Sequence, residues 1–163
     1  MPSTNERDKS TESTTLEGVL TVNPIVRNVL AVVAGLIAGS IVNMGLISCG
    51  PMFVEPPPGA DMTTPEGIKA AMSQMTVAHF LVPLAAHGLG TLAGALIAAL
   101  IAVTHKIRFA LVIGAVFLLG GIAMVAMVGG PLWFIVCDLG LAYFPMAWLG
   151  GRIGMALTTG KGT

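Results

Sequence analysis

Charged residues are missing from long parts of this 163-residue chain, and their absence constrains the fold more than any other feature. Residues 28–54 and 70–105 contain no Asp, Glu, Lys or Arg, and residues 109–151 contain only Asp138. About 20 apolar residues are enough for a helix to cross the hydrocarbon core of a bilayer. The last stretch would be about 65 Å long as one helix, which corresponds to two crossings, and the Gly-Gly-Pro sequence at 129–131 separates them. We therefore expect an all-α polytopic membrane protein whose four transmembrane helices form two antiparallel hairpins, at about residues 28–50, 77–103, 109–128 and 132–151.

The composition agrees with this class of protein. Only 10% of the residues are charged and 55% are hydrophobic, whereas a soluble domain carries about 25% charged residues. Eight Lys and Arg balance eight Asp and Glu, so the formal net charge is zero. These numbers exclude an ordinary soluble domain, and the lack of a basic surplus argues against nucleic-acid binding. The expected partner of most of the surface is the lipid bilayer.

The positions of the basic residues predict the orientation. Residues 1–24 are polar, rich in Ser and Thr, and predict a disordered cytoplasmic tail. The transmembrane bundle follows over residues 25–155, and residues 156–163 form a second, short cytoplasmic tail. Cytoplasmic loops carry an excess of Lys and Arg, and seven of the eight basic residues lie on one side if both termini are cytoplasmic: Arg7, Lys9, Arg27, Lys106, Arg108, Arg152 and Lys161. We expect a multi-pass membrane protein with both termini in the cytoplasm.

The loop between the first two spans contains a helix signal of its own. Thr64 is a suitable N-cap, and Pro65 follows at the first helical position. Ile68, Met72 and Met75 then share one helical face. This pattern predicts a short amphipathic helix at the outer interface. A cover over the mouth of the bundle is favoured over a lid that gates a substrate.

Small residues at a spacing of four mark the helix contacts, because glycine lets two helix backbones approach closely. Three pairs have this spacing: Gly35 and Gly39, Gly90 and Gly94, and Gly150 and Gly154. Packing within one bundle is favoured, but the same faces could hold a homo-oligomer or a larger membrane complex together.

Ionisable groups inside a membrane span are costly and usually functional. The predicted intramembrane polar cluster consists of Asn43, His79, His87 and Asp138. Counting helical rise from the ends of the spans places Asn43, His87 and Asp138 in one layer in the outer half of the membrane, with His79 about 12 Å further out than His87. We expect His87 and Asp138 to interact across the bundle, with Asn43 nearby. The interaction either fixes the helix register as a structural hydrogen bond or handles protons or substrate.

No motif predicts an enzyme, a metal site or a cofactor. Two histidines eight residues apart on one helix, His79 and His87, cannot bind one metal ion together, and Cys49 and Cys137 do not form a Cys-x-x-Cys motif. A Ser-His-Asp arrangement and a phosphate-binding glycine loop are also missing from the sequence. We therefore predict no catalytic residues, no bound metal and no cofactor.

Four segments resemble one group of proteins: NMGLI at 43–47, PPPGAD at 56–61, AHGLGTL at 86–92 and PMAWLGG at 145–151. Together the chain resembles small bacterial four-span inner-membrane proteins without a known activity, from residue 23 to about residue 153. The resemblance implies the location and the four-helix layout. For function we expect a non-enzymatic accessory or assembly subunit that packs through its glycine faces. The alternative is a small proton- or ion-linked transporter that uses the layer of Asn43, His87 and Asp138.

Overall fold

The computed structural model describes residues 23–159, so most of the predicted N-terminal tail and residues 160–163 lie outside the described part. Helices dominate this part, and strands are absent from it. The elements are α2 (Pro24–Cys49), a short 3-10 turn (Gly50–Met52), α3 (Pro65–Ala71), a second 3-10 turn (Met72–Gln74), α4 (Val77–Ile101), α5 (Lys106–Val128), α6 (Leu132–Leu141) and α7 (Phe144–Thr159). Four segments are long and apolar enough to cross a membrane, which confirms the expected all-α, four-span class.

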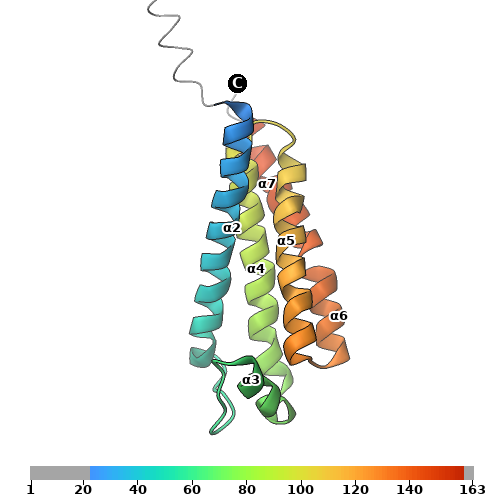
Figure 1. Ribbon diagram of the computed structural model, residues 1–163. Helices are drawn as coiled ribbons and strands as arrows, with labels where there is room; N and C mark the ends of the chain where they lie inside the picture. Colours follow the sequence, from blue (N-terminus) through green and yellow to red (C-terminus); the bar gives the residue numbers. More distant parts are fainter. Residues whose placement is uncertain (1–22, 160–163) are drawn as a thin grey trace, which may run out of the picture.

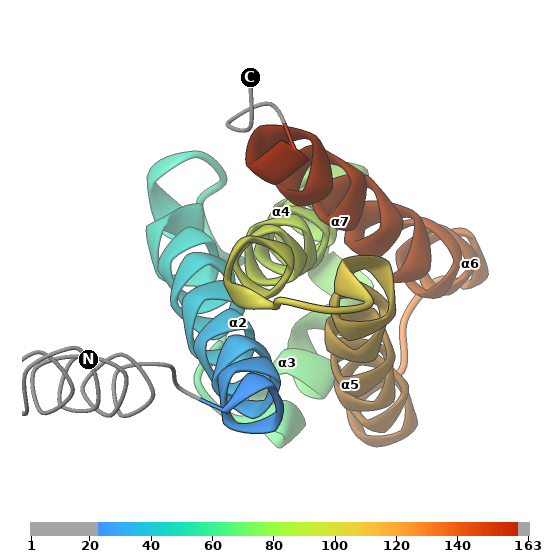
Figure 2. The ribbon, with the colours of Figure 1, turned by 90° about the horizontal axis from the view of Figure 1, so that it is seen from above.

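Helix α4 lies at the centre of the bundle, with α2 on one side and α5 and α7 on the other (Figures 1 and 2). Helices α2 and α4 form one antiparallel hairpin, and α5 forms a second with the α6–α7 segment. The start of α2 and the end of α7 lie at the same end of the bundle, called here the terminal end (Figure 1). Helix α3 lies at the opposite end, called here the α3 end.

The fourth span is interrupted, whereas the sequence predicted one helix over 132–151. Helix α6 ends at Leu141, a turn follows at Ala142 and Tyr143, and α7 continues to Thr159. Pro145 explains the break, because it has no N–H to donate to the carbonyl of Leu141 and disfavours helical geometry in Phe144. Helix α7 also continues to Thr159, into the region predicted as the C-terminal tail.

Helix α3 begins as its sequence predicts. The Thr64 side chain accepts a hydrogen bond from the Gly67 N–H at 3.1 Å, with Pro65 in the first turn. Ile68 is half-buried and Ala71 is buried, and the helix packs against α5. Seen along the bundle, α3 lies between α2 and α5 (Figure 2). This arrangement fits a cover over that end of the bundle.

The six predicted packing glycines all lie at contacts inside the bundle. A Cβ atom on Gly35 would lie 2.6 Å from the Gly94 carbonyl oxygen, and one on Gly39 would lie 2.7 Å from that of Gly90. Real Cβ atoms do not approach so closely, so α2 and α4 touch backbone to backbone. Gly150 and Gly154 contact α4 in the same way, at the Leu92 and Leu96 carbonyl oxygens. Of the two alternatives left open by the sequence, packing within one bundle is what the structure contains.

Side chains from α2 and α5 satisfy the carbonyl groups at the end of α4, which has no basic residue in its own last turn. Lys106 Nζ donates to the carbonyls of Ala99 and Ala102, and Arg27 Nε donates to that of Ile101. The Asn28 side chain accepts from the Val103 N–H at 3.0 Å and donates to the Thr104 hydroxyl at 2.8 Å. The last carbonyls of a helix need such partners, and these contacts fix the terminal end of the first hairpin.

Candidate functional site

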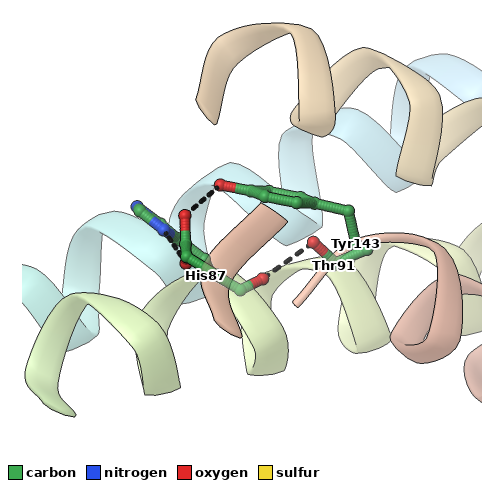
Figure 3. A network of polar contacts seen from close by, with 4 residues as sticks. His87, Thr91 and Tyr143 are labelled. Atoms are coloured by element: carbon green, nitrogen blue, oxygen red, sulfur yellow. Dashed lines mark hydrogen bonds and ion pairs between the residues drawn. The ribbon is translucent and has the colours of Figure 1, made fainter. Parts of the chain in front are cut away.

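Asp138 of α6 lies in the interior of the bundle with only 1% of its surface exposed. Its Oδ1 atom is 2.8 Å from His87 Nδ1 on α4, which is the contact expected from the sequence. Its Oδ2 atom accepts a hydrogen bond of 3.1 Å from the Tyr143 hydroxyl. Figure 3 shows these side chains converging, with the Thr91 hydroxyl donating to the His87 carbonyl at 2.7 Å. The carboxyl group is therefore held from both oxygens.

The break in the fourth span places Tyr143 beside Asp138. Tyr143 is 2% exposed and follows the last turn of α6, so its ring turns back toward the carboxyl group. Gly121 of α5 provides the space: a Cβ atom there would overlap the Tyr143 hydroxyl and lie 2.7 Å from Cζ. The rings of His87 and Tyr143 also stack, with centroids 5.9 Å apart and planes at 27°. The site is thus built by α4, α6, the turn after α6, and a gap in the side chains of α5.

The hydrogen bonds assign the proton positions in the charged state of the site. An ionised carboxylate only accepts hydrogen bonds, and Tyr143 supplies one donor. The other donor must then be His87 Nδ1–H, which leaves Nε2 with a free lone pair in the neutral imidazole. Nε2 makes no hydrogen bond to any residue between 23 and 159. The His87 side chain is 20% exposed, against 2% for Asp138, so His87 is the more accessible member of the pair.

Chemically, this arrangement can hold one exchangeable proton in a low-dielectric interior. With neutral His87 the cluster carries one negative charge, and uptake of a proton at Nε2 makes it neutral overall. Burying an unpaired charge in a membrane is expensive, and pairing reduces the cost. In both states the Nδ1–H can donate to Asp138 and the Tyr143 hydroxyl can donate to its other oxygen.

Asn43 lies close to the site but is not hydrogen-bonded to it. It faces Gly90 of α4, since a Cβ atom on Gly90 would lie 2.8 Å from the Asn43 Cβ. Its side-chain oxygen is buried and has no hydrogen-bond partner among the described residues. Asn43 is therefore in the expected region, but the structure does not join it to His87 or Asp138.

His79, the remaining member of the predicted polar cluster, lies apart from His87 and Asp138. Its Nδ1 accepts a hydrogen bond from the Thr76 N–H at 3.0 Å, and the Thr76 side chain in turn caps the start of α4. Its Nε2 is 3.0 Å from the Glu55 carbonyl oxygen and ties the preceding loop to the helix. His87 is about 12 Å further along α4. His79 is a capping residue at the α3 end.

The sequence analysis missed Tyr143 and Gly121. Tyr143 is the single tyrosine of the chain and stands between Asp138 and Pro145, which is a signal that could have been used. Gly121 gave no local signal, because its role depends on a side chain from another helix. Elsewhere in residues 23–159, no three His, Cys, Asp or Glu residues gather as a metal site would need, and Cys49 and Cys137 are free thiols.

No family model matches this chain, and comparisons with curated proteins and with solved structures find no similar protein either. The resemblance to small bacterial four-span proteins therefore stays a prediction.

Proposed function

We propose that this integral membrane protein is a small proton-linked transporter in which His87 and Asp138 bind and release the proton. The observation that carries the proposal is the buried Asp138 carboxyl group, held by His87 and Tyr143 at a break in a membrane-spanning helix. Ionisable residues at such positions mark proton relays and ion pathways. Many transporters have interrupted helices around their binding sites, because the backbone groups freed at the break can bind the ligand there.

The position of the site suggests the side from which protons arrive. Between Thr91 and the terminal end, the core of the bundle consists of small apolar side chains: Ala95, Ala98, Ala99, Ala110, Ile113 and Ala147. This half offers a proton no polar route. The half with α3 contains His87, its exposed edge, and the break in the fourth span. Proton exchange from the α3 side is therefore favoured in this conformation, and transport would require a second conformation that opens the other half.

The location in the inner membrane and the cytoplasmic termini are part of the proposal. Of the five Lys and Arg residues between 23 and 159, Arg27, Lys106, Arg108 and Arg152 lie toward the terminal end, and only Lys69 lies on α3. Glu55, Asp61 and Glu66 precede α4 at the α3 end. This distribution supports a cytoplasmic terminal end by the positive-inside rule. The site then faces the outside of the cell.

An accessory subunit is the second candidate, and the closed apolar core favours it, because a static bundle needs no path. The glycine faces no longer support it, since Gly35, Gly39, Gly90 and Gly94 are used between α2 and α4. A partner would have to bind the outer surfaces of the helices instead. In this case the His87–Asp138 contact would only hold α6 in position.

Two measurements on the full chain in liposomes separate these candidates. Infrared difference spectra between two pH values should show a carboxylate band that shifts when His87 takes up its proton and that is missing in Asp138→Asn. Proton flux after a pH step should fall at least tenfold in Asp138→Asn and His87→Gln. Glu66→Gln is the matched control, because Glu66 is exposed on α3 and does not touch the site. Flux no greater than in protein-free liposomes, with unfolding of Asp138→Asn, would favour the accessory role.

A further inference from the structure

The Asn43 side-chain oxygen is the only buried side-chain polar atom without a hydrogen-bond partner among residues 23–159. More than about 90% of buried polar groups in proteins have a partner, and an exception usually points to a water or ion that completes the site. An unsatisfied acceptor costs about 1–3 kcal/mol. A leucine, which has a similar size, would avoid this cost. We therefore expect Asn43 Oδ1 to accept a hydrogen bond from a partner outside this chain.

The geometry of α4 brings this oxygen to the neighbourhood of His87. Asn43 contacts Gly90, which is three residues after His87. Three residues correspond to about 4.5 Å along a helix and about 60° around it. Gly90, where Asn43 of α2 packs on α4, therefore lies on the turn after His87 and about 60° around the helix from it.

We propose that Asn43 Oδ1 and His87 Nε2 together bind a small ligand that donates at least two hydrogen bonds, either a water molecule or an ammonium-type cation. The inference deepens the proposed function, since it names the ligand that delivers the proton to His87, and in that respect it rests on it. Both atoms are acceptors when Asp138 is ionised, so the ligand must supply a donor to each. The buried carboxylate behind the ring attracts a cation.

The chemistry of the two atoms excludes other ligand classes. Alkali and alkaline-earth ions prefer oxygen ligands and gain little from an imidazole nitrogen. A large solute is excluded because α2 and α4 meet directly beside the site, where a Cβ on Gly90 would lie 2.9 Å from the Gly39 carbonyl oxygen. A molecule of one or two heavy atoms that carries two hydrogen-bond donors is small enough and can donate to both acceptors.

Other ionisable groups do not change this assignment. In the fourth span, which packs against α4 beside His87, the ionisable residues are Asp138, Cys137 and Tyr143. Helix α2 carries Arg27 at the terminal end and Cys49 at its exposed other end, and α5 carries Lys106 and Arg108 at the terminal end. The charge that faces the His87 ring is therefore that of Asp138.

The test follows the nitrogen-15 signal of His87 Nε2 in the full-length protein in lipid nanodiscs, at constant pH and ionic strength. His87→Gln identifies the signal. Ammonium, methylammonium, tetramethylammonium and sodium chlorides are added to the wild type, Asn43→Leu, Asn43→Asp and the control Met44→Leu, whose residue is exposed on the same helix. Asn43→Leu should fold at least as stably as the wild type, because it removes an unsatisfied group.

If the ligand is ammonium-type, ammonium and methylammonium should shift the Nε2 signal with saturation, and tetramethylammonium and sodium should not. The apparent affinity for ammonium should fall at least tenfold in Asn43→Leu but not in Asn43→Asp or Met44→Leu. A water ligand predicts no effect of any salt, with an Nε2 signal displaced in Asn43→Leu alone. Two results overturn the proposal: an Nε2 signal in Asn43→Leu identical to the wild type under every salt, or equal displacement in Asn43→Leu and Asn43→Asp. The proton-flux test does not use Asn43, so either idea can fail while the other survives.

Discussion

The packing of Tyr143 against Gly121 gives the sharpest prediction about the site. In Gly121→Ala the new methyl group would overlap the Tyr143 hydroxyl and lie 2.7 Å from Cζ. Carbon atoms pack best at about 3.5–4.0 Å, so the ring has to move by about 1 Å. The bond from the hydroxyl to Asp138, already 3.1 Å long, would then be broken.

The magnitude combines three effects. A hydrogen bond to a charged group contributes about 1.5–3 kcal/mol, and overpacking costs about 1–3 kcal/mol. Alanine is better than glycine inside a helix by about 1 kcal/mol, which offsets part of the loss. We therefore expect Gly121→Ala to lower the free energy of unfolding by about 2–5 kcal/mol.

Gly120→Ala is the matched control, because a Cβ atom there has nothing within 4 Å. It carries the same change in helix propensity and should leave stability unchanged or raise it by up to about 1 kcal/mol. Both variants would be unfolded by denaturant in the same mild detergent, with helicity followed by circular dichroism. The infrared band of Asp138 should move only in Gly121→Ala. If the two variants agree within about 0.5 kcal/mol and the band is unchanged, Tyr143 is not held as described.

Three further predictions concern other parts of the molecule. Gly94→Ala should lower the thermal unfolding midpoint, because its Cβ would lie 2.6 Å from a carbonyl oxygen of α2, whereas Gly45→Ala should not, since Gly45 faces open space. Asn28→Leu leaves the Val103 N–H without its partner and should cost about 1–3 kcal/mol, with faster proteolysis of the loop after α4 as the readout. The Thr63 side chain, its N–H and the Thr64 hydroxyl donate to Asp61 and lower the pKa of that carboxyl below 3.8. The contribution of Asp61 to loop order should thus be complete above pH 3.8 and lost as the pH falls through the lowered pKa; an NMR titration would show this midpoint move back up in Thr63→Val.

The features that sequence predicts well here are local ones. The spans follow from the length of uncharged stretches, and α3 begins at Thr64 and Pro65 because a cap depends only on its own neighbours. The contact of His87 with Asp138 could be expected by counting depth along two helices, since an expensive group in lipid has few partners to choose from.

The features that sequence predicts poorly depend on which helix faces which. His79 lies in the first turn of α4, and its role as a cap depends on the turn at Thr76, which the sequence does not reveal. The spacing of Gly90 and Gly94 predicts a close contact, but it does not tell whether the contacting helix belongs to the same chain. A proline inside a helical pattern can either kink the helix or end it, and the sequence does not tell which of the two Pro145 does.

The break after Leu141 gives the His87–Asp138 contact a second consequence. Helix α7 packs along both α4 and α5, whereas α6 makes far fewer contacts with them. Trp133 and Phe134 at the start of α6 pack on Phe80 of α4, and Asp138 near the end of α6 contacts His87 of α4. The turn at Ala142 and Tyr143 interrupts the helix between α6 and α7, and we expect it to let α6 move relative to α7. Because proton uptake at Nε2 changes the charge of the cluster at this attachment, the proton and the position of α6 are expected to be coupled. A transporter needs a coupling of this kind between its site and a movable segment, and an accessory subunit does not. Measuring the distance between labels on α6 and α4 at two pH values would therefore show which of the two roles the contact serves.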